Sequence, residues 1–149
     1  MILPTDGSKL SFLGVEEGLK VAKCLDTPVV AVFVIKPSSY YQGLVEYDAT
    51  DVAFSAQQMI KESLEKQGEE VLKRVETKAQ ELGVKLETKI QEGTPYKVIT
   101  EMANDDDIIY ISSHGHSGLS SLFLGSTTDR VLKHTRSTVA VVRPSSESS

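Results

Sequence analysis

Apolar and polar residues alternate along this chain in blocks that predict strands and helices in turn. Continuous apolar runs rich in β-branched residues, such as Val29 to Ile35, suit strands that are covered on both faces, as in a parallel sheet. Between such runs, apolar residues recur every three or four positions, which is the spacing of one helix face. The pattern predicts five strands that alternate with four helices.

The boundaries of these elements follow from turn and capping residues. The expected strands lie at residues 1–5, 29–35, 84–90, 108–112 and 138–144. The expected helices end near residues 25, 82, 103 and 134. Gly83 stops the second helix, which begins at about Ala53, and Thr94 with Pro95 forms an N-cap and first-turn pair for the third. The polar stretch at residues 36–52 is expected to be a long loop.

Strands that alternate with helices predict βαβ units, and hence an α/β fold whose parallel sheet is doubly wound into a three-layer α/β/α sandwich. The strand at residues 84–90, VKLETKI, alternates polar and apolar positions and is expected near a sheet edge. No repeat or linker divides the chain. We therefore expect one domain over residues 1–144 and a disordered tail, SSESS, at residues 145–149.

The composition of the chain indicates which classes of partner and which cellular compartment fit it. The formal net charge is −5 over 149 residues, and no cluster of Lys and Arg marks a nucleic-acid surface. The longest apolar runs are far shorter than the about 20 residues that span a bilayer, and no signal peptide opens the chain. A single cysteine, Cys24, fits a reducing compartment. We expect a cytoplasmic protein with no nucleic-acid or membrane partner.

Two loops at the carboxyl ends of predicted strands carry candidate chemistry. The first, PTDGS, contains Asp6, whose carboxylate can accept hydrogen bonds from ligand hydroxyls or cap its own turn. The second, SSHGHSGLSSLFLGSTTDR, covers residues 112–130. In doubly wound sheets, ligands bind beyond the carboxyl ends of the strands, where the strand order reverses. If strands one and four are neighbours, the two loops face each other at that point.

The end of the second loop suits an anion. Gly125 and Ser126 open a helix, whose first N–H groups lack internal partners and lie at the positive end of its dipole. Thr127 and Thr128 add hydroxyl groups. The segment Ser126 to Asp129 also has the S-x-x-D form of a capping box, in which these residues only satisfy the helix start. The residues alone leave phosphate binding and plain capping both open.

The order of these segments resembles the universal stress protein family over nearly the whole chain. PTDGS, a spaced glycine loop, GST-x-x-R-V-L and a closing VAVVRP follow one another as in that family. Its nucleotide-binding branch is marked by G-x2-G-x9-G-[ST], and Gly115, Gly125 and Ser126 match the last three of these positions. Ser112 stands at the first glycine position, where its side chain hinders close approach of a ligand to the backbone.

The resemblance implies the strand order 3-2-1-4-5, which makes strands one and four neighbours. It also implies that ATP, or AMP or ADP, lies across that switch point, with Mg²⁺ or Mn²⁺ offsetting repulsion from an acidic protein. The residues implied at the adenine and ribose end are Pro4, Thr5, Asp6 and Val34. Those implied around the ribose and phosphates are Ile111, Ser112, His114 and Gly115, followed at the helix start by Gly125, Ser126 and Thr127.

Two further positions differ from the family pattern. His116 stands where Arg or Lys often follows the glycine, which weakens charge compensation for a triphosphate at neutral pH. Thr127 replaces a residue that is usually apolar, and adds a hydroxyl group.

Catalytic and metal sites fit the residues less well. A Ser-His-Asp hydrolase built from Ser113, His114 and Asp6 lacks the G-x-S-x-G elbow, and sequence neighbours rarely aim at each other as nucleophile and base. His114 and His116 have no accompanying Cys, Asp or Glu in their loop to complete a metal site. No residue presents itself as a general base over a γ-phosphate. We expect a binding protein, with at most slow hydrolysis of ATP.

The main alternative is a nucleotide-free dimeric interaction module of the same fold, since some members of the family lack the nucleotide motif. The last strand is apolar on both faces and lies at a sheet edge in the order 3-2-1-4-5. An exposed apolar edge is an aggregation hazard unless it is paired or covered by a loop. We expect a homodimer in which Thr138 to Arg143 pairs with its own copy. Occupancy of the nucleotide loop would then act as a switch for an unidentified protein partner.

Overall fold

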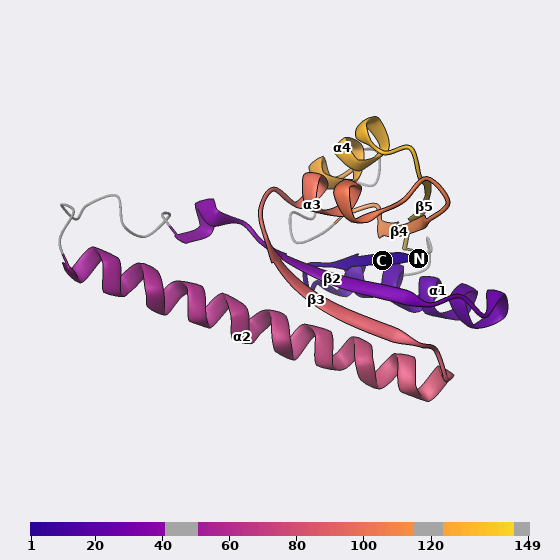
Figure 1. Cartoon of the computed structure of the whole chain (residues 1–149), viewed down its shortest axis with the longest axis horizontal. Coiled ribbons are helices and arrows are strands. Elements are labelled where there is room, and N and C mark those ends of the chain that lie inside the picture. The colour runs from indigo at the N-terminus through magenta and orange to yellow at the C-terminus, as the bar shows by residue number, and fades with distance from the viewer. Residues whose placement is uncertain (41–50, 115–123, 145–149) are drawn as a thin grey trace.

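The computed structural model describes residues 1–40, 51–114 and 124–144, and their strands form one parallel sheet (Figure 1). Its order is β3-β2-β1-β4-β5, so the implied order and the adjacency of strands one and four are confirmed. The strands are β1 (Ile2–Thr5), β2 (Val29–Ile35), β3 (Leu86–Glu92), β4 (Ile108–Ser112) and β5 (Thr138–Val142). The predicted tail at residues 145–149 lies outside the described residues.

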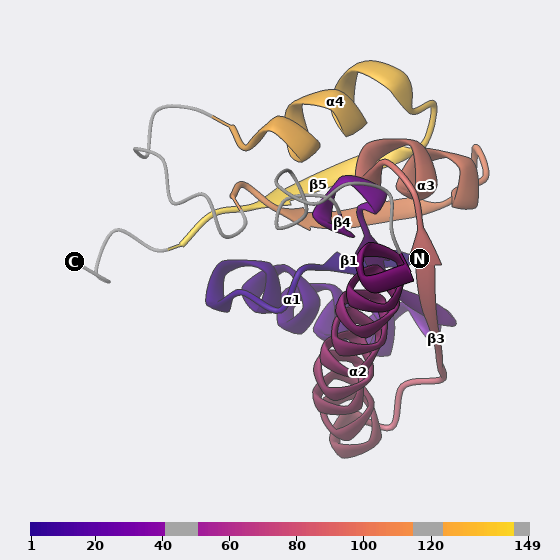
Figure 2. The same ribbon diagram turned by 90° about the vertical axis from the view of Figure 1, so that its left-hand side faces the viewer.

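Helices cover both faces of the sheet, which confirms the doubly wound sandwich. Helices α1 (Lys9–Leu25) and α2 (Asp51–Leu82) lie on one face. Helices α3 (Pro95–Met102) and α4 (Ser126–His134) lie together on the other (Figure 2). None of the helices in the described ranges is long and apolar enough to cross a membrane.

The continuous apolar sequence of β2 is explained by this two-sided cover. Ala31 and Phe33 pack in a buried cluster with side chains of α1 and α2, such as Leu19 and Val75. Val32, between them, packs in a second cluster with α3 and α4. Because successive side chains of a strand point to opposite faces, each must be apolar when both faces are covered.

The β3 strand begins two residues later than expected. Gly83 ends α2 with a φ of +70°, and the N–H of Val84 still donates to the carbonyl of Ala79 at 2.9 Å. These residues therefore complete the helix end, and parallel pairing with β2 starts only at Leu86. The prediction of an edge strand there is confirmed.

The stretch expected as a loop at residues 36–52 is helical at both of its ends in the structure. A short 3₁₀ helix occupies Pro37–Tyr40, and α2 begins at Asp51, two residues before the expected start. The rest of that stretch, residues 41–50, lies outside the described residues.

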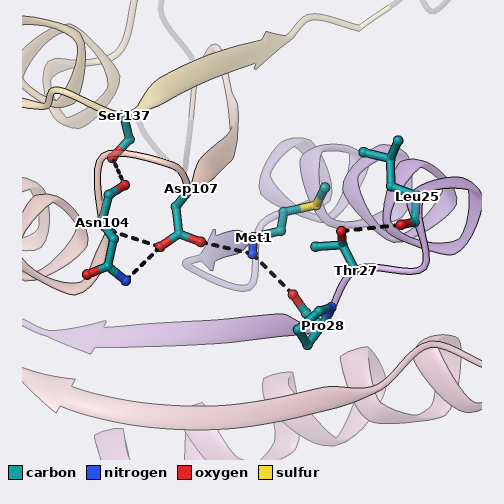
Figure 3. Close-up of polar contacts among 7 residues, drawn as sticks. All are labelled: Met1, Leu25, Thr27, Pro28, Asn104, Asp107 and Ser137. Carbon is teal, nitrogen blue, oxygen red and sulfur yellow. Dashed lines mark hydrogen bonds and ion pairs between the residues drawn. The ribbon is translucent and has the colours of Figure 1, made fainter.

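A polar network joins several chain segments at the amino end of the sheet (Figure 3). The Met1 ammonium donates to the Pro28 carbonyl at 3.1 Å and to Asp107 Oδ1 at 3.2 Å. The N–H of Asn104 donates to Asp107 Oδ2 at 2.8 Å, and the Ser137 hydroxyl donates to the Asn104 carbonyl at 2.8 Å. This network fixes the end of the sheet that lies opposite the loops expected to bind a ligand.

Candidate functional site

A cavity of about 350 Å³ opens at the carboxyl ends of β1, β2 and β4. This is the edge where ligands bind in doubly wound sheets, next to the point where the strand order reverses. Ten of the eleven residues expected at the site line it: Pro4, Thr5, Asp6, Val34, Ile111, Ser112, His114, Gly125, Ser126 and Thr127. The eleventh, Gly115, lies outside the described residues.

The β1–α1 turn is built around two side-chain oxygens. Asp6 Oδ1 accepts from the N–H of Ser8 at 3.0 Å, and Thr5 Oγ1 accepts from the N–H of Gly7 at 3.1 Å. Thr5 Oγ1 also lies 2.9 Å from the hydroxyl of Ser11 in α1. Asp6 therefore does cap its own turn. It lines the cavity as well, so its role toward a ligand stays a prediction.

Ser112, which departs from the family's glycine, has a defined structural place. Its hydroxyl donates to the backbone carbonyl of His114 at 2.7 Å, and Ser112 is 6% exposed. Its own carbonyl accepts from the hydroxyl of Thr128 at 2.8 Å. The Ser112 side chain therefore stabilises the turn after β4. The Ser112 carbonyl, through its bond with Thr128, also connects the end of β4 to α4.

The capping-box interpretation of α4 is wrong. The N-cap is Gly125 rather than Ser126, and among the described residues no side-chain hydrogen bond caps the start of this helix. The N–H of Gly125 donates to the Ser113 carbonyl at 2.7 Å, while the Asp129 carboxylate accepts from Lys133 at 2.8 Å, one turn along. Ser126 and Thr127 line the cavity, so the positive end of α4 borders it without a side-chain cap.

His114 is the most unusual member of the lining. It is 7% exposed, and its Nδ1 lies 3.1 Å from the Ser113 hydroxyl. Its Nε2 is buried with no hydrogen-bond partner in the part of the chain that the structure describes. Native proteins rarely bury a polar atom in this way, because its lost hydration is not replaced. The sequence placed His114 at the site but gave no sign of this free ring nitrogen.

Sequence reasoning missed the contributions of two helices. Leu64 and Gln67 of α2 and Pro95 and Ile99 of α3 also line the cavity. Their positions depend on how each helix packs across the sheet, which a local motif does not record. The apolar residues Ile60, Leu64 and Val71 recur at helical spacing, and this spacing is the sequence signal that Leu64 faces inward.

Two basic residues, Lys36 and Arg130, border the site and the hollow beside it. Lys36 lines the cavity and also an adjoining hollow of about 470 Å³, which includes Arg130. Ser126 and Thr127 border both spaces. The lining of the adjoining hollow contains no carboxylate among its described residues. Within an acidic protein, this edge therefore suits an anionic ligand.

Comparison with known proteins agrees with this geometry. The sequence model of the universal stress protein family matches residues 1–143. The chain is 34% identical over 145 residues to the universal stress protein MJ0531 of Methanocaldococcus jannaschii, covering 96% of this chain and 81% of that protein. Both matches span the strands, helices and cavity described above.

Solved structures share the fold. The protein MJ0577 superposes with a TM-score of 0.76 at 24% identity, covering 96% of this chain and 94% of that one. A universal stress protein in complex with cAMP has a TM-score of 0.63 at 18% identity, with coverages of 95% and 94%. An Arabidopsis thaliana family member with AMP bound has a TM-score of 0.64 at 18% identity, with coverages of 98% and 92%.

Proposed function

Because the chain belongs to the universal stress protein family, we propose that its cavity binds an adenine nucleotide: ATP, ADP or AMP. The observation that carries the proposal is the start of α4, which borders the cavity at Ser126 and Thr127 and has no side-chain cap from the described part of the chain. Unpaired N–H groups at the positive end of a helix are a ready site for phosphate. Family members crystallised with cAMP and with AMP support the choice of adenine.

The lining suggests how the nucleotide lies. Phosphates occupy the start of α4, at Gly125, Ser126 and Thr127, and Asp6 accepts hydrogen bonds from the ribose hydroxyls. The base rests on the apolar part of the lining, formed by side chains such as Val34 of β2. In this arrangement the phosphates lie at a helix N-terminus, the ribose hydroxyls lie at a carboxylate and the base lies on apolar side chains.

A divalent cation fits this donor set when the ligand is a polyphosphate. Mg²⁺ is usually held by one or two carboxylates together with phosphate oxygens, and Asp6 is the carboxylate in the described lining. The hydroxyls of Ser126 and Thr127 are further oxygen donors there. Bound Mg²⁺ or Mn²⁺ supplies positive charge that offsets repulsion between ATP and a protein of net charge −5.

Calorimetric titration with AMP, ADP and ATP plus Mg²⁺ tests the proposal. We expect a dissociation constant in the micromolar range, which corresponds to about −8 kcal/mol. Gly125→Val should abolish this heat, because a branched side chain fills the approach to the helix start, and Ser126→Ala should weaken it. Arg136→Ala, at a position outside the cavity lining, is the control and should bind as the wild type does. Absence of heat with all three nucleotides contradicts the proposal.

We further propose that the protein is a cytoplasmic homodimer and that it acts as a nucleotide-dependent switch. Strand β5 lies at the edge of the sheet, and four of its five residues are only partly buried. Pairing of Thr138 to Arg143 with its own copy would cover that edge. The N–H of Ser113, which follows β4, donates to Val142 of β5 at 2.8 Å, so the turn bordering the nucleotide site contacts the proposed dimer strand.

A further inference from the structure

The hollow beside the nucleotide cavity is lined by segments from three parts of the fold. It has a volume of about 470 Å³ and lies where the end of β2, the turn between β3 and α3, and the first turn of α4 meet. Thr94, Tyr96 and Arg130 line this hollow and do not line the nucleotide cavity. The hollow is therefore a neighbouring space with side chains of its own.

The two basic residues of this hollow, Lys36 and Arg130, form no ion pair within the described part of the chain. Two acidic residues that are close in sequence to the lining are paired elsewhere. Glu92 Oε1, at the end of β3, lies 2.6 Å from Nζ of a lysine of α2, and Asp129 Oδ2 lies 2.8 Å from Nζ of Lys133. The positive charge of the hollow is thus not neutralised by these carboxylates.

The Arg130 side chain is held in place by an aromatic ring. Its guanidinium lies over the ring of Tyr96, 5.4 Å from the ring centre. The ring of His134 packs against the same tyrosine, with the two ring centres 5.0 Å apart. A guanidinium that stacks on an aromatic face keeps a planar set of N–H donors that matches the oxygens of a phosphate. Because this side chain is already partly ordered, less conformational entropy is lost when a ligand binds.

Two helix starts add hydrogen-bond donors to the hollow. Thr94 is the N-cap of α3, and its side chain makes no capping hydrogen bond among the described residues. Thr94 and Tyr96 line the hollow from α3, and Ser126 and Thr127 line it from α4. The first N–H groups of a helix lack internal partners and lie at the positive end of its dipole. The described lining therefore combines two cations, hydroxyl groups and helix starts with no carboxylate.

We infer that this hollow binds a phosphate-type oxyanion, with Lys36 and Arg130 as charged donors and the Thr94 hydroxyl as a neutral one. Arginine can donate two parallel N–H groups to such an anion, and lysine adds a compact positive charge. The oxyanion has two possible sources, because the hollow shares Lys36, Ser126 and Thr127 with the nucleotide cavity. It is a free phosphate group or the outer phosphate of a nucleotide bound next to it. Binding of free phosphate does not depend on the proposed function.

An amide ¹H–¹⁵N NMR titration of the full chain with inorganic phosphate, at an ionic strength held constant with sodium chloride, tests this inference. We expect saturable shifts at Lys36, Thr94, Tyr96 and Arg130, with a dissociation constant in the millimolar range. Lys36→Gln and Arg130→Gln should each raise that constant about 10-fold or more, as for loss of a hydrogen bond between charged groups.

Lys97→Gln and Arg136→Gln are the matched controls, because each removes one positive charge at an exposed position outside both linings. Both should bind phosphate as the wild type does. Equal losses in the controls and in the two test variants would show only a dependence on net charge, and would overturn the inference. Absence of phosphate-specific shifts in the wild type, or an unchanged constant in both Lys36→Gln and Arg130→Gln, would also overturn it.

Repeating the phosphate titration on protein saturated with ATP identifies the source of the oxyanion. If ATP prevents phosphate from binding, the phosphates of the nucleotide reach the hollow. If phosphate still binds, the hollow is a site for a separate oxyanion. AMP binding without phosphate binding at the hollow would overturn this inference and leave the proposed function standing. Phosphate binding at the hollow without binding of AMP, ADP or ATP would do the reverse.

Discussion

Asp107 accepts hydrogen bonds from the distant Met1 ammonium and from both the backbone and the side-chain N–H groups of the nearby Asn104. The Met1 ammonium lies 3.2 Å from Oδ1, and the N–H of Asn104 lies 2.8 Å from Oδ2. Burial by itself raises the pKa of this carboxyl, but the hydrogen bonds and the ammonium charge outweigh it and hold the pKa below its usual value. Among Asp105, Asp106 and Asp107, the sequence did not reveal which carboxylate has this role.

The lowered pKa of Asp107 predicts a stability term that depends on pH. A carboxyl whose folded pKa is depressed contributes stability above its unfolded pKa, near 3.8, and loses it as pH falls through the folded pKa. Asp107→Asn should therefore lower the free energy of unfolding by about 1 kcal/mol at neutral pH. The difference from the wild type should shrink in urea denaturation below pH 3.8.

The neighbouring Asp106→Asn is the control for this prediction, because Asp106 is exposed. It should change the free energy of unfolding little at any pH in that range. An effect of Asp107→Asn that stays constant from neutral to acid pH would show that the charge of Asp107 is not responsible.

Elements meet at the site through close contacts that the sequence pattern does not express. A side-chain carbon built on Gly14 of α1 would lie 3.0 Å from the backbone nitrogen of Ser112, so α1 packs directly against the end of β4. On the other face, the Thr128 hydroxyl of α4 donates to the carbonyl of the same Ser112. The end of β4 is therefore held from both layers. Periodicity predicted each of these elements, but not the contacts that position them.

Thr128→Val tests the hold of α4 on β4. Thr128 is 3% exposed, and valine keeps its shape while removing the hydroxyl that pairs with the Ser112 carbonyl. We expect the free energy of unfolding to fall by about 1–3 kcal/mol, measured by urea denaturation without nucleotide. Thr127→Val, one residue earlier in the same helix and only partly buried, should cost much less. Equal losses from both variants would refute the specific role of Thr128.

At the level of the whole molecule, the sequence pattern predicts the type of sheet but not the order of its strands. Buried runs such as Val29–Ile35 predicted the parallel sheet correctly because strands covered on both faces must be apolar throughout. The order β3-β2-β1-β4-β5 came only from the family resemblance, since periodicity does not say which strands are neighbours. Gln67 of α2 was missed for the same reason: its place in the lining depends on helix packing. Gly125 and Ser126 do open α4 as the sequence indicates, but the capping box that Ser126 to Asp129 also fits is not formed.

The proposed dimer, paired through β5, can be tested by a substitution in that strand. In an antiparallel pair related by a twofold axis, the centre of the β5 strand lies close to its own copy. Ala140 lies at that centre, so Ala140→Asp brings like charges together and should convert the dimer to a monomer. Sedimentation equilibrium measures the mass of each variant. Gln80→Asp, an exposed position on α2, is the control and should remain dimeric. A wild-type protein that sediments as a monomer contradicts the dimer.

We propose above that an adenine nucleotide occupies the cavity at the carboxyl ends of β1, β2 and β4. An amide ¹H–¹⁵N NMR titration with AMP tests it most directly, because it reports both binding and location. We expect saturable shifts at Asp6, Val34, Ser126 and Thr127, while the polar network around Asp107 at the opposite end of the sheet stays unaffected. Shifts absent from these cavity residues at saturating AMP, or concentrated on another surface, would contradict it.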